Sequence, residues 1–128
     1  MIETQTQVRS YDVHARSTET FGRVLCGCRN HHFVVDGPVQ NGCPGEAVTP
    51  AELFLSGVAA CGVELVQVIA KEKSLPLRAV RIAVFGAIDR SAPVRPDVAL
   101  FNSVRLQFDL EGVTREQGED LVAVFKRR

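Results

Sequence analysis

The sequence predicts a single α+β domain in which antiparallel strands surround one long, buried central helix. Three observations support this class. Short runs of β-forming residues fill the region from Val8 to Asp36. An apolar stretch from Leu53 to Ala70 has the boundary signals of a helix, and two strand-like runs and a second helical pattern follow it. With 128 residues and 45% hydrophobic content, residues 1–128 can form one domain with its own core.

The first region is predicted to be a meander of about three strands. Its runs are interrupted at Thr20-Phe21-Gly22, at Gly27 and at Arg29-Asn30, and His31–Val35 is the clearest strand. The residues from Gly37 to Gly45 are rich in glycine, proline and asparagine, which favour turns. They predict a loop that leads into the central helix.

The central helix has the best-marked start in the sequence. Thr49-Pro50-Ala51-Glu52 is a capping box with proline at the first helical position, where a missing N–H costs nothing. The helix is expected to continue to about Lys73, because a lysine favours the C-terminal end of the helix dipole and Pro76 prevents continuation.

Apolar side chains cover nearly the whole circumference of this helix, so it needs burial on more than one side. We therefore expect a homodimer in which a second copy of the chain covers the helix, with Gly57, Ala60 and Gly62 allowing close approach. Glu64 and Gln67 interrupt the apolar stretch, which argues for a buried helix rather than a membrane span.

Two alternating runs follow, one from Ala79 to Val84 and one from Val104 to Leu110, and they predict a β-hairpin. Thr114-Arg115-Glu116-Gln117 is a second capping box. It predicts a last helix whose apolar side chains share one face.

Charge and targeting signals exclude several classes of protein. Fifteen basic residues balance fifteen acidic ones, so we expect no nucleic-acid and no membrane partner. Met1 to Tyr11 lacks the apolar stretch of a secretory signal, which predicts a cytoplasmic protein. In a reducing compartment, catalysis, metal binding or packing is a more plausible role for the four cysteines than a disulfide.

Cys61 is the main candidate for chemistry. It lies about three turns into the central helix, where the dipole of the N-terminus has faded. A reactive thiolate there needs a nearby cation, for which Arg16, Arg23 and Arg29 are the local candidates. The alternative is that Cys61 simply packs in a seam of small residues.

Two acids on the same helix favour the reactive role. Glu64 lies one turn beyond Cys61, and Glu52 lies at the helix start. A carboxylate that holds an arginine beside a thiol lets a thiolate form and attack a peroxide oxygen. Glu64 has the alternative roles of a solvated residue or a salt bridge at a dimer contact.

The other cysteines permit a zinc hypothesis. Cys26, Cys28 and Cys43, with His31 and His32, offer enough ligands for a tetrahedral site, but their spacing is not a standard one. Cys26 and Cys28 point to the same side of a strand, where packing or exposure is the simpler explanation. A regulatory or resolving thiol among the three is a further alternative.

Two segments resemble one protein family. Thr49 to Cys61 reads Thr-Pro-Ala-Glu-Leu-Phe-Leu-Ser-Gly-Val-Ala-Ala-Cys. This is similar to the OsmC/Ohr signature, in which a P-x-E-L or P-E-Q-L helix start leads to an A-A-C or G-A-C cysteine. The run from Arg29 to Pro38 resembles the R-x-H-x-x-x-x-D-x-P strand and turn of the OsmC-like branches.

The resemblance implies an OsmC-like α+β fold in which antiparallel sheets of two intertwined chains wrap paired central helices. It also implies a thiol-dependent peroxidase for organic hydroperoxides or hydrogen peroxide. Cys61 would be its nucleophile, with an external thiol as reductant and no cofactor or metal. Glu52 or Glu64 would orient the activating arginine. No family motif assigns that arginine: Arg29 is preferred, and Arg16 and Arg23 stay open. The rival is a stress-associated protein of the same fold that binds a small ligand without catalysis.

The chain departs from the family pattern at two places. Ala51 stands where the hydroperoxide-reductase branch has its glutamate, so Glu52 matches only the P-x-E-L branch. A resolving Cys-Pro segment after the last helix has no counterpart before Arg128, and neither has the family's last strand. Either the chain is truncated before this segment, or the resolving step differs and an external thiol or one of Cys26, Cys28 and Cys43 reduces Cys61.

Overall fold

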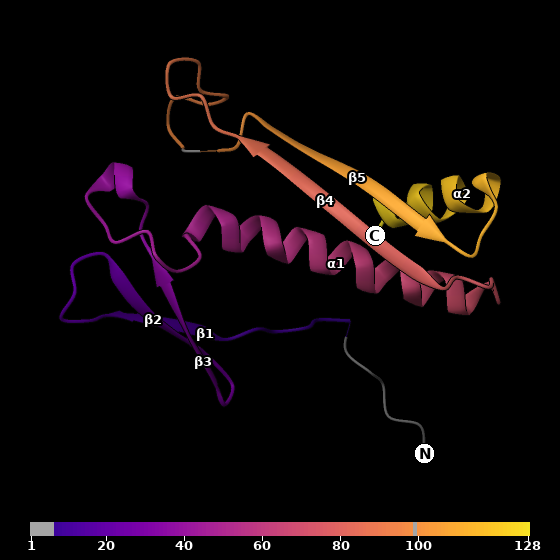
Figure 1. The fold of residues 1–128 in the computed structure, drawn as a ribbon, viewed down its shortest axis with the longest axis horizontal. Helices are drawn as coiled ribbons and strands as arrows, with labels where there is room; N and C mark the ends of the chain where they lie inside the picture. Colours follow the sequence, from indigo (N-terminus) through magenta and orange to yellow (C-terminus); the bar gives the residue numbers. More distant parts are fainter. Residues whose placement is uncertain (1–6, 99) are drawn as a thin grey trace. The chain divides into compact units, whose positions relative to one another are not determined.

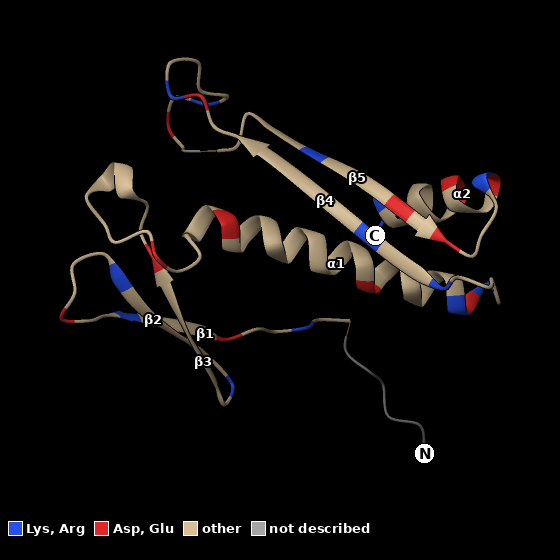
Figure 2. Cartoon of the chain, viewed as in Figure 1, with Lys and Arg blue, Asp and Glu red and all other residues tan. Residues whose placement is uncertain are grey.

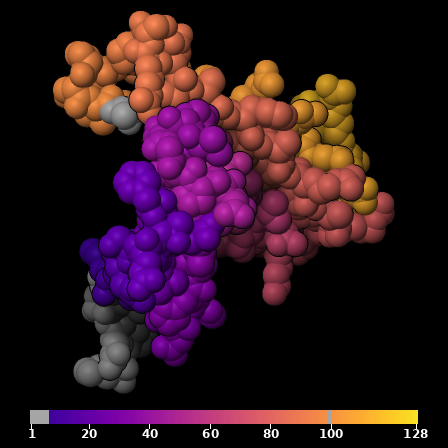
Figure 3. Space-filling model, turned by 60° about the vertical axis from the view of Figure 1, so that its left-hand side comes forward, coloured from indigo at the N-terminus to yellow at the C-terminus, as the bar shows by residue number. Residues whose placement is uncertain are grey.

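The computed structural model describes residues 7–98 and 100–128, in which five strands, one 3₁₀ helix and two α-helices follow one another as in Figure 1. The chain forms two compact units, one up to Glu52 and one from Leu53 onward. In Figure 3 the atoms of the first unit are indigo to magenta and those of the second are magenta to yellow. Each unit is described by itself.

The first unit is the predicted meander. Strands β1 (Val13–Ser17), β2 (Arg23–Cys28) and β3 (His31–Asp36) form an antiparallel sheet in the order β1-β2-β3. Cross-strand partners share a face, so one face carries mainly apolar side chains and the other carries histidine, arginine and aspartate. The prediction of about three strands is confirmed.

Two turns in the first unit use the left-handed backbone region. Arg29, at the tip of the β2–β3 hairpin, has φ 54°, which is uncommon for a residue other than glycine. After β3, the 3₁₀ helix η1 (Val39–Asn41) ends at Gly42 with φ 76°, where glycine avoids a steric cost. The turn-rich loop expected after the meander is therefore present.

The second unit contains most of the long helix α1 (Pro50–Glu72), the hairpin of β4 (Ala79–Ala87) and β5 (Ser103–Glu111), and the helix α2 (Arg115–Lys126). The two strands pair antiparallel, from Ala79 opposite Glu111 to Ala87 opposite Ser103. The element boundaries agree closely with those expected from the two capping boxes and the two alternating runs.

The core of the second unit lies where α1 packs on α2 and on the hairpin. Its fully buried members are Val66, Ile69, Ala70 and Leu121. Gly62 allows the close approach, because a methyl group at this position would lie 2.6 Å from Cδ1 of Ile82. Phe108 and Phe125 pack edge to face over the same core, with ring centroids 5.7 Å apart.

Helix α1 is not buried on all sides within this chain, and the sequence analysis expected a second copy of the chain to cover the remainder. Its buried residues are confined to Gly62, Val66, Ile69 and Ala70, and the side chain of Phe54 is 58% exposed. The reason is that a two-stranded sheet and one short helix cover only one face. By length and composition alone α1 is also apolar enough to cross a membrane, a test that core helices of other proteins pass as well.

Basic and acidic residues are interspersed along both units (Figure 2). In the second unit they form surface ion pairs between elements, such as Lys73 with Asp120 at 3.0 Å and Arg81 with Asp109 at 2.9 Å. The loop between β4 and β5 projects from this unit as the orange lobe in Figure 3.

Candidate active site

Cys61 lies on an exposed stripe of α1. Phe54, Gly57, Cys61, Glu64 and Val68 follow one another at intervals of three or four residues, so they share one helix face, and all five are exposed. This is the opposite side from Val66 and Ile69 in the core. The thiol is therefore accessible to a small molecule within this unit.

The surroundings of Cys61 differ from those expected. The alternative to a reactive thiol was packing in a seam of small residues, but within this chain Cys61 is an exposed free thiol. Among the residues that the structure describes, it has no hydrogen bond to another group. The helix face that bears Cys61 carries no cation among the five residues of its exposed stripe, so a cation that activates the thiol has to come from another element or another chain.

An aromatic pair lies on the same stripe, about two turns before the thiol. The ring of Phe54 stacks on Phe101 with centroids 5.6 Å apart and an interplanar angle of 18°. Phe101 comes from the β4–β5 loop, whose sequence has no pattern that marks it as a site residue. The face that bears Cys61 is thus largely apolar, apart from Glu64.

Glu52 serves as a helix cap. Its Oε1 accepts hydrogen bonds from the backbone N–H of Thr49 at 3.0 Å and from the hydroxyl of Thr49 at 2.9 Å. These two bonds lower the pKa of Glu52, because they favour its charged form. The predicted capping box is confirmed, and the expected role of Glu52 in orienting an arginine stays a prediction.

Glu64 is exposed within this chain, so its own fold does not bury it or require an arginine partner for it. It shares the exposed face with Cys61, as the spacing predicted. Among residues 7–98 and 100–128 it forms no ion pair. Within a single chain Glu64 is solvated, and a salt bridge at a dimer contact stays a prediction.

Arg23 is held by acids in the first unit. It binds both carboxylate oxygens of Asp36 at 2.8 and 2.9 Å and Glu46 at 3.0 Å. Asp36 is fully buried, and its Oδ2 also accepts the backbone N–H groups of Glu46 and Ala47. This network ties the loop before α1 to the sheet, so Arg23 is better explained as a structural residue than as the activator of a thiol.

Each member of the Arg23–Asp36 pair shifts the pKa of the other. The Arg23 guanidinium holds the pKa of Asp36 far below its usual range against the cost of burial, and Asp36 raises the pKa of Arg23. The sequence singled out Arg23 only as a local cation. The Asp36 partner became visible only with the register, in which Arg23 lies opposite Asp36.

Arg16 and Arg29 are exposed, and neither forms an ion pair with a residue that the structure describes. Arg29 projects from the hairpin tip, and Arg16 lies on β1. Both are therefore free to meet an incoming group. The structure assigns Glu52 and Arg29 to the first unit and Cys61 to the second, so these three do not form a site within either unit.

The other three cysteines do not form a metal centre. No group of three or more histidine, cysteine and acidic residues suited to a metal ion occurs in the described part of the chain. Cys26 and Cys28 share one sheet face with His31, whereas His32 lies on the other, and Cys43 fits between Gly22 and Gly37. The described residues therefore give the zinc hypothesis no support.

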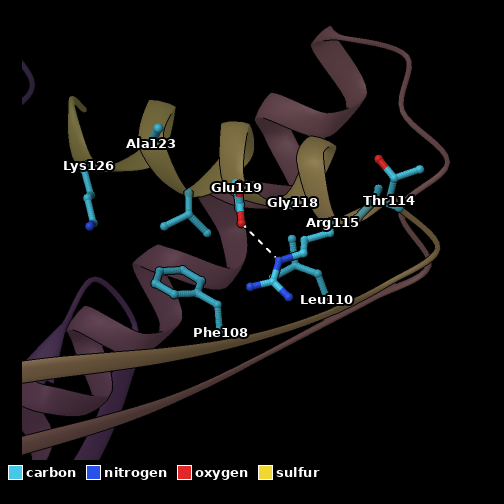
Figure 4. Close-up of a pocket in the computed structure, with 10 residues that line it drawn as sticks. Phe108, Leu110, Thr114, Arg115, Gly118, Glu119, Ala123 and Lys126 are labelled. Atoms are coloured by element: carbon cyan, nitrogen blue, oxygen red, sulfur yellow. Dashed lines mark hydrogen bonds and ion pairs between the residues drawn. The ribbon is translucent and has the colours of Figure 1, made fainter.

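A separate cavity of about 470 Å³ lies between β5 and α2 (Figure 4). Phe108 and Leu110 form part of its apolar wall, and the ion pair of Arg115 with Glu119 lies at its edge. Cys61 is not among its lining residues. This cavity therefore adds nothing to the candidate thiol site.

The geometry defines an α+β protein with two antiparallel sheets, a long helix and an accessible thiol on that helix. Solved structures with this arrangement are similar along most of the chain. An OsmC-like protein from Mycoplasma pneumoniae has a TM-score of 0.79, with 16% identity over 94% of this chain and 82% of that chain.

Two organic hydroperoxide resistance proteins match as well. The one from Elizabethkingia anophelis has a TM-score of 0.75 and 18% identity over 96% of this chain and 85% of that chain. The one from Legionella pneumophila has a TM-score of 0.71 and 21% identity over 95% and 85%. No protein-family model matches this chain, and no curated protein matches its sequence. The chain has the OsmC-like fold, and the expected resemblance to the OsmC/Ohr family is confirmed at that level.

Proposed function

We propose that this protein is an OsmC/Ohr-type thiol peroxidase that uses Cys61 to reduce hydroperoxides. The observation that carries the proposal is the accessible thiol of Cys61 on the central helix of an OsmC-like fold. Similar structures include proteins described as organic hydroperoxide resistance proteins. The motif from Thr49 to Cys61 supports the same assignment.

The proposed reaction has two halves. The Cys61 thiolate attacks one peroxide oxygen, the O–O bond breaks, and the other oxygen leaves with a proton as an alcohol or water. Cys61 then carries a sulfenic acid. One external thiol condenses with it to a mixed disulfide and water, and a second external thiol releases Cys61 and leaves with the first as a disulfide. No cofactor takes part.

Organic hydroperoxides are the preferred substrate class. The exposed face that bears Cys61 also carries Phe54 and Val68, and Phe101 stacks on Phe54. Apolar surface of this kind stabilises a bulky organic group more than it stabilises hydrogen peroxide. Hydrogen peroxide is then the slower substrate.

A second copy of the chain is the proposed partner. The exposed stripe of α1 is apolar over several turns, and an uncovered surface of this kind usually marks an interaction site. In a homodimer the second chain covers part of this stripe and leaves Cys61 open to a hydroperoxide, and an arginine of the first unit, Arg29 or Arg16, is supplied to the thiol. The cytoplasm is the proposed location.

The test is the rate at which reduced protein consumes cumene hydroperoxide and hydrogen peroxide, with Cys61 oxidation followed by mass spectrometry. We expect rapid sulfenic acid formation at Cys61, faster with cumene hydroperoxide, and complete loss of turnover in Cys61→Ser. Cys26→Ser is the matched control and retains turnover. An unreactive Cys61 overturns the proposal and favours the non-catalytic, ligand-binding alternative.

A further inference from the structure

The first unit carries two histidines on either side of a glycine. His14 on β1 lies opposite Gly27 on β2, and Gly27 lies opposite His32 on β3. Residues directly opposite each other in antiparallel strands point to the same face. The row therefore places two imidazoles on one face with no side chain between them.

The ring of His14 occupies the space above Gly27. A methyl group added to Gly27 would lie 2.6 Å from Nε2 and 3.0 Å from Cε1 of His14. Any other residue at position 27 would displace the imidazole. The glycine thus allows a ring nitrogen of His14 to lie over the middle strand, on the side of His32.

A hollow of about 180 Å³ is present at this row. Its lining residues are His14, Arg16, Leu25, Cys26, Gly27 and His32. Arg16 is two residues from His14 on the same strand and so points to the same face. Its polar side chains are two imidazoles and one guanidinium, and no carboxylate lines the hollow.

The acids nearest to this face are already bound or lie elsewhere. Asp36 on β3 is held by Arg23. Asp12 precedes His14 by two residues, and together with His14 and Arg29 it lines a neighbouring hollow, not the hollow of the row. Arg16 forms no ion pair with the described residues. The permanent charge of Arg16 therefore has no counter-ion from this part of the chain.

We propose that His14, Arg16 and His32 form a binding site for a small oxyanion, such as a phosphate or carboxylate group. Each imidazole supplies an N–H donor, and Arg16 supplies a charge and paired donors that match an oxyanion. The alternative of a transition-metal ion is disfavoured because no acid contributes and a guanidinium lies in the same hollow. The hollow does not include Cys61. Arg16 is the one residue that it shares with the candidates for activating that thiol, and the anion titration needs no peroxide turnover.

The test is a titration of the whole protein with inorganic phosphate and, separately, with acetate, at constant ionic strength held with chloride. The ring signals of the histidines are followed by NMR. The chain has three histidines, and His31 lies on the opposite sheet face, so it provides an internal reference. We expect saturable shifts at His14 and His32 with at least one of the two anions and none at His31.

Variants separate binding from a general salt effect. His14→Ala, His32→Ala and Arg16→Gln are each expected to weaken the affinity about tenfold, the loss of one charge-assisted hydrogen bond. His31→Ala is expected to leave it unchanged, and amide spectra check that each variant is folded. Equal or unsaturable shifts at all three histidines overturn the proposal. Saturable binding of Zn²⁺ at His14 and His32 without anion binding also overturns it and makes the pair a metal site.

Discussion

At the scale of single residues, the interaction of Arg23 with Asp36 is the most consequential feature outside the thiol. Asp36 is completely buried and accepts four hydrogen bonds, two from Arg23 and two from backbone N–H groups of the following loop. Each bond favours the charged carboxylate. The first unit has few other buried side chains, so its stability depends on this network to an unusual degree.

Replacing Asp36 by asparagine is expected to lower the denaturation midpoint by about 10 °C, because it removes the buried carboxylate that pairs with the partly exposed Arg23 and leaves Arg23 with Glu46 alone. The pKa of Asp36 is lowered by folding. Its stabilisation is therefore complete above the pKa of the unfolded chain, about 4, and is lost as the pH falls below that value. Thermal melts between neutral and acid pH are expected to show a steeper acid loss for the wild type than for Asp36→Asn. Parallel curves would contradict this.

Two substitutions at Glu52 separate its structural role as a helix cap from its proposed chemical role at Cys61. Glu52→Gln preserves a capping box, because a glutamine also accepts from the Thr49 N–H, whereas Glu52→Ala removes the cap. We expect the glutamine variant to unfold close to the wild-type temperature and the alanine variant to unfold earlier. If the charge of Glu52 orients an arginine at Cys61, both variants lose peroxide turnover. Full turnover in Glu52→Gln would restrict Glu52 to capping.

At the scale of elements, the helix starts are specified locally. Thr114 accepts from the backbone N–H of Gln117 at 3.2 Å, and Gln117 accepts from the backbone N–H of Thr114 at 2.9 Å. Thr114→Ala is expected to lower the free energy of unfolding by about 1 kcal/mol. Denaturant unfolding measures this, with Thr114→Ser as the control that keeps the cap. An unchanged midpoint for both would show that the cap is not needed for α2.

The strands and helices were predictable because their signals are local. A capping box or an alternation of apolar residues lies within a few residues of the element that it specifies, as at Thr49 and Thr114. The pairing of Arg23 with Asp36 and the stacking of Phe101 on Phe54 depend on residues far apart in the sequence. No local pattern encodes such a pairing, so the candidate site was only partly predictable.

The exposure of α1 shows the same limit in another way. The composition of the helix predicted burial on every side, but burial depends on how much surface the neighbouring elements can cover. Here the hairpin and α2 cover the side of Val66 and Ile69, and the side of Cys61 is left open. The sequence indicated that the chain alone would not cover this helix, but it did not show which face would be left open.

At the scale of the whole molecule, the open stripe of α1 leads to a prediction about assembly. A lysine in place of Val68, which is 40% exposed, introduces a charge into the proposed dimer contact. We expect Val68→Lys to sediment as a monomer of 14.0 kDa and the wild type at twice that mass. Val94→Lys, in the β4–β5 loop, is the control and stays dimeric. A monomeric wild type would contradict the proposed dimer and leave the source of the arginine open.

The left-handed backbone conformation at Arg29 affects the free energy of unfolding at a residue that is also a candidate for activating Cys61. Arg29 and Ser74 both have φ 54°, a conformation that costs a non-glycine residue about 1 kcal/mol. Arg29→Gly and Ser74→Gly are therefore both expected to raise the free energy of unfolding by about this amount, unless the flexibility of glycine in the unfolded chain offsets it.

If Arg29 activates Cys61, only Arg29→Gly also abolishes peroxide turnover, and Ser74→Gly stays fully active. Denaturant unfolding and peroxide assays on the two variants compare the effects directly, and an active Arg29→Gly would leave Arg16 as the activator. If Arg29→Gly is instead more stable and inactive, the chain keeps an arginine at the hairpin tip for its chemistry at a cost in the free energy of unfolding. Selection for heat resistance alone would be expected to remove that arginine before it altered the buried core.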